Sequence, residues 1–210
     1  MIIDGIKDSM ILVDEGGGGD YTPCPEGSFM ARCIRLVDLG TQASEFEGEK
    51  KSKREVMITW EVYVLNEDET LALRDNGSPF EISKRYTASL NEKASLRKHL
   101  DAWRGRPFTE EELTGFDLPK ILNTYCLINI QTRESKKGKK YAFIAGIMAA
   151  PRGTPKPEPI NAYMQVSLRN FEPDFFAELP EYVQDIIKQS AEWPLIEAVL
   201  AAPSSEAIPF

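Results

Sequence analysis

The chain has 210 residues, of which 42% are hydrophobic and 28% are charged, with 25 Lys and Arg against 33 Asp and Glu. This composition is typical of a globular protein large enough to enclose a core, and it excludes a disordered chain. No apolar run approaches the roughly 20 residues of a membrane helix. The first residues also lack the basic-then-apolar pattern of a signal peptide. We therefore expect a protein of a cytosol without a membrane partner.

The net charge of −8 is unevenly distributed along the chain. Residues 1–27 carry a net −5 and residues 154–210 a net −6, whereas residues 28–153 carry a net +3. Nucleic-acid binding depends on local Lys and Arg that neutralise phosphates, so the acidic total does not exclude it. The middle region is where a phosphate-binding surface is expected.

The cysteines and the single histidine limit the chemistry that the chain can perform. Cys24, Cys33 and Cys126 are odd in number and widely spaced, which excludes a disulfide framework and a paired zinc site. We expect His99 at the surface or at the core boundary, because a lone histidine specifies chemistry poorly. The sequence predicts no cofactor, no metal ligand and no catalytic residue.

Glycine, proline and apolar periodicity divide the chain into five parts. A flexible acidic lead-in covers residues 1–27, a domain 28–150, a Pro-rich linker 151–160, a helical extension 161–202 and a tip 203–210. Alternating apolar residues predict strands at 28–40, 54–66, 80–90, 124–133 and 140–149, with a loop at 41–53.

Helical signals lie between the third and fourth strands and in the extension. Leu96, Leu100 and Trp103 share one helical face, and Thr109 with Glu112 is a capping box. Further helices are predicted over 180–190 and 194–202. We expect these to pack on the chain's own sheet. The alternative is packing on another copy, which leaves a homodimer open.

The order of strands and helix predicts a mainly β fold for residues 28–150. The expected fold is a five-stranded OB-fold, which is a Greek-key barrel closed at one end by a helical segment between strands 3 and 4. A C-terminal helical extension follows this barrel. The alternative is a generic α+β domain or a sandwich.

An OB-fold binds oligonucleotides on its strand 2–3 face, between the loops joining strands 1 to 2 and 4 to 5. Both segments are rich in Lys and Arg here. Tyr63 is expected to face solvent, and Tyr86 and Tyr141 adjoin cations, so all three are candidate base-stacking residues. Arg104 and Arg106 extend this surface or pair with the acids of residues 110–113. The predicted DNA-binding residues are Lys50, Lys51, Lys53, Arg54, Tyr63, Lys84, Arg85, Tyr86, Arg133, Lys136, Lys137, Lys139, Lys140 and Tyr141.

The last residues, SEAIPF, resemble the C-terminal tip of bacterial single-stranded DNA-binding proteins. This resemblance implies that Glu206, Ile208, Pro209 and Phe210 recruit host or phage replication and recombination proteins. The tail holds one acid where that family has a run. Segments 31–42, 96–118 and 141–159 are similar to a family of bacteriophage-encoded proteins from replication and recombination gene neighbourhoods. That similarity implies that the protein acts in the cytoplasm of an infected bacterium.

These observations predict a non-enzymatic protein that binds and protects single-stranded DNA, without sequence preference, in phage replication or recombination. One alternative is a metal-dependent nuclease that uses Glu81 and Lys84 with Asp38 or Glu61. The other is a partner-binding adaptor. An acidic C-terminal segment can compete with DNA, so removing residues 154–210 is predicted to tighten binding at low salt, provided that the barrel stays folded.

Overall fold

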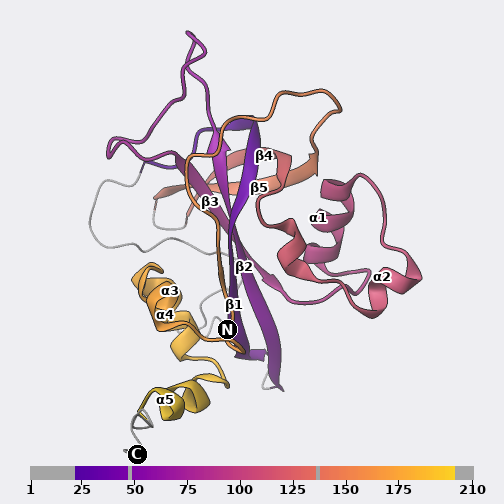
Figure 1. The fold of residues 1–210 in the computed structure, drawn as a ribbon, viewed down its shortest axis with the longest axis vertical. Helices are drawn as coiled ribbons and strands as arrows, with labels where there is room; N and C mark the ends of the chain where they lie inside the picture. The colour runs from indigo at the N-terminus through magenta and orange to yellow at the C-terminus, as the bar shows by residue number, and fades with distance from the viewer. Residues whose placement is uncertain (1–21, 47–48, 136–137, 202–210) are drawn as a thin grey trace, which may run out of the picture.

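The computed structural model describes residues 22–46, 49–135 and 138–201. Its elements follow one another along the chain in the order shown in Figure 1. They are β1 (Gly27–Phe46), β2 (Glu49–Tyr63), β3 (Phe80–Thr87), α1 (Ser95–Arg104), α2 (Glu110–Thr114), the 3-10 helix η1 (Leu118–Ile121), β4 (Tyr125–Glu134), β5 (Lys140–Ala149), β6 (Met164–Val166), α3 (Pro173–Ala177), α4 (Glu181–Lys188) and α5 (Trp193–Ala201).

The fold is mainly β, as predicted. The strands form one sheet in the order β3-β2-β1-β4-β5, in which neighbours are antiparallel, and β6 runs parallel to β1. Figure 1 shows β4 and β5 crossing the direction of the other strands, so the sheet is strongly curved. The curvature brings β3 toward β5, where Lys84 Nζ donates to the Ile144 carbonyl at 3.5 Å. The inner side of this curved sheet holds the main core.

The predicted apolar alternation places side chains in that core. Trp60 is fully buried, and its ring lies 5.7 Å from that of Trp103 on α1. Leu96 and Leu100 are buried beside it, so α1 packs on the inner side with the face that its spacing predicts. The capping box of Thr109 and Glu112 is also present.

The predicted loop at 41–53 is wrong, because these residues extend β1 and β2 into a paired ribbon. Ala43 pairs with Ser52 and Gln42 with Lys53. Most of these residues are polar, without the apolar alternation that predicts a strand, so their composition resembles that of a loop. We call residues 38–46 and 49–54 the ribbon.

Bulges in β1 let this strand serve a second core. The register shifts between Cys33 and Arg35 and again between Asp38 and Gly40. A bulge changes the face to which the following residues point. Leu36 therefore joins the main core, whereas Val37 and Leu39 join the second one.

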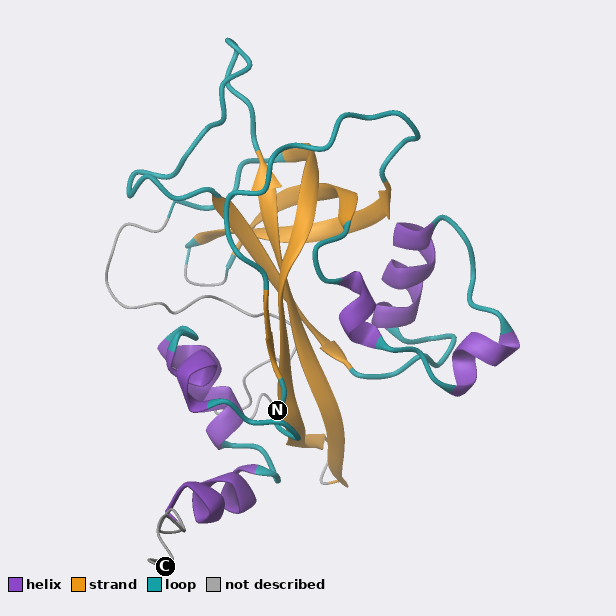
Figure 2. Ribbon diagram, viewed as in Figure 1, coloured by secondary structure: helices purple, strands orange, loops and turns teal. Residues whose placement is uncertain are grey.

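The C-terminal helices cover the outer side of β1 and β2. Val183 and Ile187 of α4 pack with Val37, Leu39 and Met57 of the sheet. The prediction that these helices pack on the chain's own sheet is therefore confirmed. Figure 2 shows α3, α4 and α5 on one side of the strands and α1 and α2 on the other.

Two short elements, β6 and α3, were not predicted, because neither is long enough to show a period. None of the helices in the described part of the chain has the length and apolar character that a membrane crossing requires. Because β6 and α4 complete the second core, residues 154–210 do not form a detachable acidic tail. The truncation prediction requires that residues 28–150 stay folded, and removal of β6 and α4 would expose Val37, Leu39 and Met57 of the sheet.

Candidate nucleic-acid interface

The outer face of β2 and β3, which the sequence predicts as the binding face, is covered in part by the chain itself. At one end α4 packs on Met57. At the other end lie residues 156–161, which we call the strap. The strap is held by Glu61, whose carboxylate accepts hydrogen bonds from the backbone N–H groups of Ile160 at 3.4 Å and Asn161 at 2.8 Å.

Glu61 is the centre of a buried polar network beneath the strap. Its carboxylate pairs with the Arg32 guanidinium at 3.1 Å and accepts a 2.5 Å hydrogen bond from the Tyr63 hydroxyl. Arg32 and Glu61 are 1% and 0% exposed. Burial alone would raise the pKa of Glu61. Hydrogen bonds from Tyr63, Asn161 and Arg32 outweigh it and bring that pKa below its ordinary value. Glu61 is therefore a structural carboxylate.

Two of the three predicted stacking tyrosines are buried. Tyr63 points outward, as its position in the strand predicts, but the strap and Tyr125 cover it, and it is 5% exposed. Tyr86 is 2% exposed, and its hydroxyl lies 2.8 Å from Nδ1 of the half-buried His99. The prediction that bases stack on Tyr63 and Tyr86 is wrong, because both rings are almost fully buried. His99 lies at the core boundary as expected.

The predicted cations of β3 are also occupied. Lys84 points to the inner side, and its ammonium lies 5.6 Å from the centroid of the Tyr86 ring. Burial lowers the pKa of Lys84. Arg85 pairs with Glu55. Neither belongs to an open phosphate-binding surface. Arg104 and Arg106 both pair with Glu112, which is the pairing alternative that the sequence left open.

The first basic segment lies on the ribbon. Lys51 and Lys53 are exposed, and Arg54 pairs with Asp38. The side chain of Lys50 lies outside the described ones. Figure 1 shows the far end of the ribbon at the bottom of the view and the turn end of β4 and β5 at the edge of the upper part of the sheet, so the two basic segments lie on different parts of the molecule.

The second basic segment belongs to an open sheet face at the β4–β5 hairpin. Gln131 pairs with Phe143 and Arg133 with Tyr141, so all four side chains point to the outer side, opposite the buried Ile130 and Ile144. We call these four residues the hairpin face. The Arg133 guanidinium carbon lies 4.2 Å from the Phe143 ring centroid. Tyr141 and Phe143 are half-buried, and Lys139 and Lys140 next to them are exposed. Lys136 and Lys137 lie outside the described residues.

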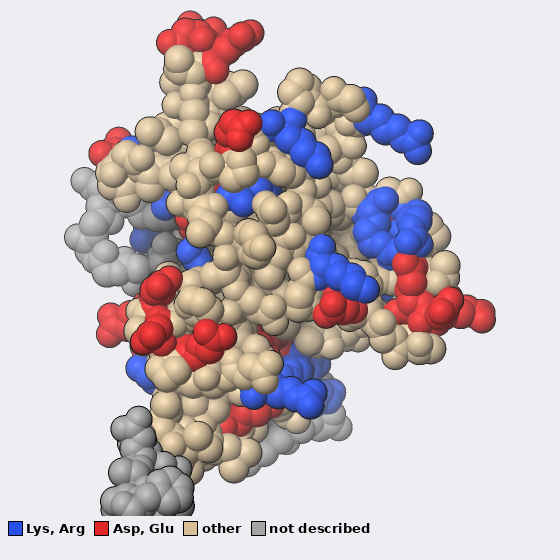
Figure 3. Space-filling view, viewed as in Figure 1, with Lys and Arg blue, Asp and Glu red and all other residues tan. Residues whose placement is uncertain are grey.

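The face continues along β4 and β5 with small and amide side chains. Asn129 pairs with Gly146, and Leu127 pairs with Met148, which is 53% exposed. The described helices pack elsewhere: α1 on the main core and α3 to α5 on the second core or beyond it. Figure 3 shows acidic side chains gathered over α2 and over α3 and α4. The hairpin face thus combines cations with partly exposed aromatic rings away from the acidic helices.

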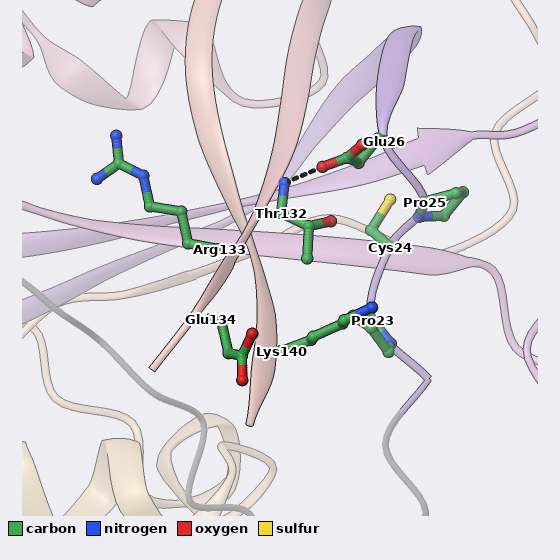
Figure 4. A pocket seen from close by; sticks show the side chains of 8 residues that line it. All are labelled: Pro23, Cys24, Pro25, Glu26, Thr132, Arg133, Glu134 and Lys140. Carbon is green, nitrogen blue, oxygen red and sulfur yellow. Dashed lines mark hydrogen bonds between the residues drawn. The ribbon is translucent and has the colours of Figure 1, made fainter. Parts of the chain in front are cut away.

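An open depression of about 630 Å³ borders the hairpin (Figure 4). Its charges are mixed, because Glu26, Glu134, Lys140 and Arg133 all belong to its lining, and Glu26 accepts a hydrogen bond from the Thr132 N–H at 2.6 Å. Cys24 and the flanking prolines provide apolar wall. This mixture of charge does not select a polyanion.

Of the residues of the nuclease alternative, Glu61 and Glu81 are cross-strand neighbours on β2 and β3, whereas Lys84 points to the inner side, and each of the carboxylates is paired with an arginine. Asp38 pairs with Arg54, Glu61 with Arg32, and Glu81 with Arg35 at 3.7 Å. Within the described ranges, no group of three or more His, Cys, Asp or Glu side chains is arranged to hold a metal ion.

The predicted tip residues Glu206, Ile208, Pro209 and Phe210 lie outside the described part of the chain. Comparison with known protein-family models and with curated protein sequences finds no match.

Proposed function

We propose that this protein binds single-stranded DNA without sequence preference through the hairpin face. The observation that carries the proposal is the arrangement of Arg133 over Phe143 beside Tyr141. Aromatic rings provide stacking surfaces for any base, and neighbouring guanidinium and ammonium groups track the phosphates. Stacking of this kind requires unpaired bases, which favours single strands over a duplex.

The strand order supports an OB-fold as the finer description. β1 lies between β2 and β4, β3 approaches β5, and α1 lies between β3 and β4 in the chain, which is the arrangement of a five-stranded Greek-key barrel. In this proposal the cation-bearing face has moved from β2 and β3 to β4 and β5, because the strap and α4 occupy the usual one.

The proposed setting is phage DNA replication or recombination in the cytoplasm of an infected bacterium. The protein coats and protects exposed strands there, and the residues after α5 recruit replication or recombination partners. The sequence resemblances support this setting. The acidic total charge is compatible with it, because part of the acidic charge gathers over α2 and over α3 and α4.

Fluorescence polarisation with oligo-dT tests the proposal. The protein should bind at low salt without divalent metal, and binding should weaken as salt rises. Phe143→Ala should reduce affinity by roughly 5- to 150-fold, because one base-stacking contact contributes about 1–3 kcal/mol. Phe175→Ala is the matched control, since this ring is exposed on α3.

Three outcomes would contradict the proposal. Absence of binding at low salt would refute DNA binding altogether and favour the adaptor alternative. Strand cleavage after addition of Mg²⁺, abolished by Glu81→Ala, would establish the nuclease alternative. Equal affinity of Phe143→Ala and wild type would show that DNA binds somewhere other than the hairpin face.

A further inference from the structure

The strap lies at the opposite end of β4 from the hairpin. Residues 150–155 connect it to β5, and its Pro157 carbonyl accepts a 2.7 Å hydrogen bond from the hydroxyl of Tyr125, the first residue of β4. Lys156 Nζ lies 5.5 Å from the centroid of the Tyr125 ring, and the Lys156 side chain is exposed. A cation therefore stands over an aromatic ring here, as at Arg133 and Phe143.

Both cations border one continuous sheet face. Tyr125 and Arg133 lie eight residues apart on β4, and an even separation places both side chains on the outer side. At about 3.4 Å per residue, the two ends of this face are about 27 Å apart. Between them, Asn129, Gly146 and Met148 offer amide, backbone and apolar contacts rather than charge.

This pattern suits an extended polyanion with flat, partly apolar groups between its charges. We propose that the strap is a working part of the DNA interface and that Lys156 holds a phosphate at the end of the bound strand opposite Arg133. This inference rests on the proposed function. A single strand would run along β4 from the hairpin face to the strap and cover the outer face of β4 and β5.

The strap must be held in place for Lys156 to act in this way. Glu61 binds it at Ile160 and Asn161, and Tyr125 binds it at Pro157. These are positioning residues, because their described contacts hold the strap. The inference reverses the truncation prediction, since removal of residues 154–210 would remove Lys156 and weaken binding.

Two oligonucleotide lengths separate this inference from the proposed function. Oligo-dT of roughly 4 nucleotides is short enough to bind at the hairpin face alone, whereas roughly 16 nucleotides cover the whole face. Lys156→Gln should weaken binding of the long oligonucleotide and leave the short one unchanged. It should also reduce the slope of log K against log salt by about 0.7, the value of one phosphate contact on a single strand. Lys188→Gln on α4 makes the same change of charge away from the strap and is the matched control.

Tyr125→Phe tests the positioning of the strap without a change of charge. It should weaken binding of the long oligonucleotide and leave binding of the short one unchanged, whereas a general loss of folding would weaken binding of both. The inference is overturned if Lys156→Gln behaves as Lys188→Gln does, or if it weakens both lengths equally. If wild type binds neither length, the proposed function itself fails.

Discussion

The buried pair of Arg32 and Glu61 allows a sharp prediction about stability. Glu61→Ala removes the partner of a guanidinium that is 1% exposed, and it also removes the acceptor for the Tyr63 hydroxyl and the Asn161 N–H. The guanidinium cannot reach water without moving the strap. It therefore stays buried without its counter-charge, or the strap leaves the sheet.

The expected loss follows from that burial. Removing one partner of a buried ion pair costs about 3–5 kcal/mol of unfolding free energy. A domain of ordinary stability has about 5–15 kcal/mol, so the loss is a large fraction of the total. The pair of Arg35 and Glu81 on the same sheet is a matched comparison, because its charges are 3.7 Å apart and about a quarter exposed. Glu81→Ala should cost no more than about 1 kcal/mol.

Urea denaturation followed by tryptophan fluorescence measures both variants. The double variant Arg32→Met with Glu61→Leu should recover part of the loss, because no unpaired charge is then buried. Since the pKa of Glu61 in the folded state lies below its ordinary value, its contribution is complete at neutral pH and is lost as acid protonates the carboxylate. The reasoning is refuted if Glu61→Ala costs no more than Glu81→Ala.

Three further predictions concern the close contact of Gly40 on β1 with Ser190 after α4, the histidine and the cysteines. Gly40→Ala should lower the free energy of unfolding by about 1–3 kcal/mol more than Gly77→Ala in the same urea assay. Both glycines have positive φ, but a Cβ at Gly40 would lie 2.6 Å from Ser190 Cβ, whereas a Cβ at Gly77 would have no atom within 4 Å. Equal losses would contradict this. Burial lowers the pKa of His99 to about 4. Below about pH 6.5 the unfolded chain therefore binds a proton at His99, whereas the folded chain does not bind it until about pH 4. Stability should therefore fall between pH 6.5 and 4, and His99→Gln should reduce that fall; an unchanged pH profile would count against it. Burial raises the pKa of Cys24 and Cys33 to about 12 and that of Cys126 further, so a thiol-reactive reagent at pH 8 should modify the three only after unfolding; rapid labelling of the folded protein would show otherwise.

Local periodicity predicted the elements that face the main core. The alternation around Trp60 and the spacing of Leu96 and Leu100 both report which side chains are buried, and the structure buries all three. Such patterns are readable because one face of each element must be apolar, wherever that element is finally placed. The ribbon was missed for the same reason, because its mostly polar residues show no apolar alternation even where Gln42 is buried against α4.

The candidate site was predicted in part. The alternation of β4 and β5 and the basic hairpin between them brought Arg133, Lys139, Lys140 and Tyr141 to attention. Phe143, whose ring lies under Arg133, was one of the strand aromatics considered for base stacking but was not selected as a site residue. The signal that could have found it is its parity, two residues from Tyr141 and opposite Gln131 on the outer side of the hairpin.

Composition and periodicity determined that this is a mainly β protein, which side of most strands is buried, and where cations concentrate. Whether an outward side chain is exposed was decided only by the tertiary structure. Tyr63 points outward as predicted, yet it is buried, because Asn161, nearly 100 residues further along the chain, brings the strap across it. Parity within a strand is a local property of the backbone, whereas the covering of a sheet face depends on contacts between distant segments. For this reason the outer face of the sheet is open at β4 and β5 and closed at β2 and β3, although the sequence places cations near both.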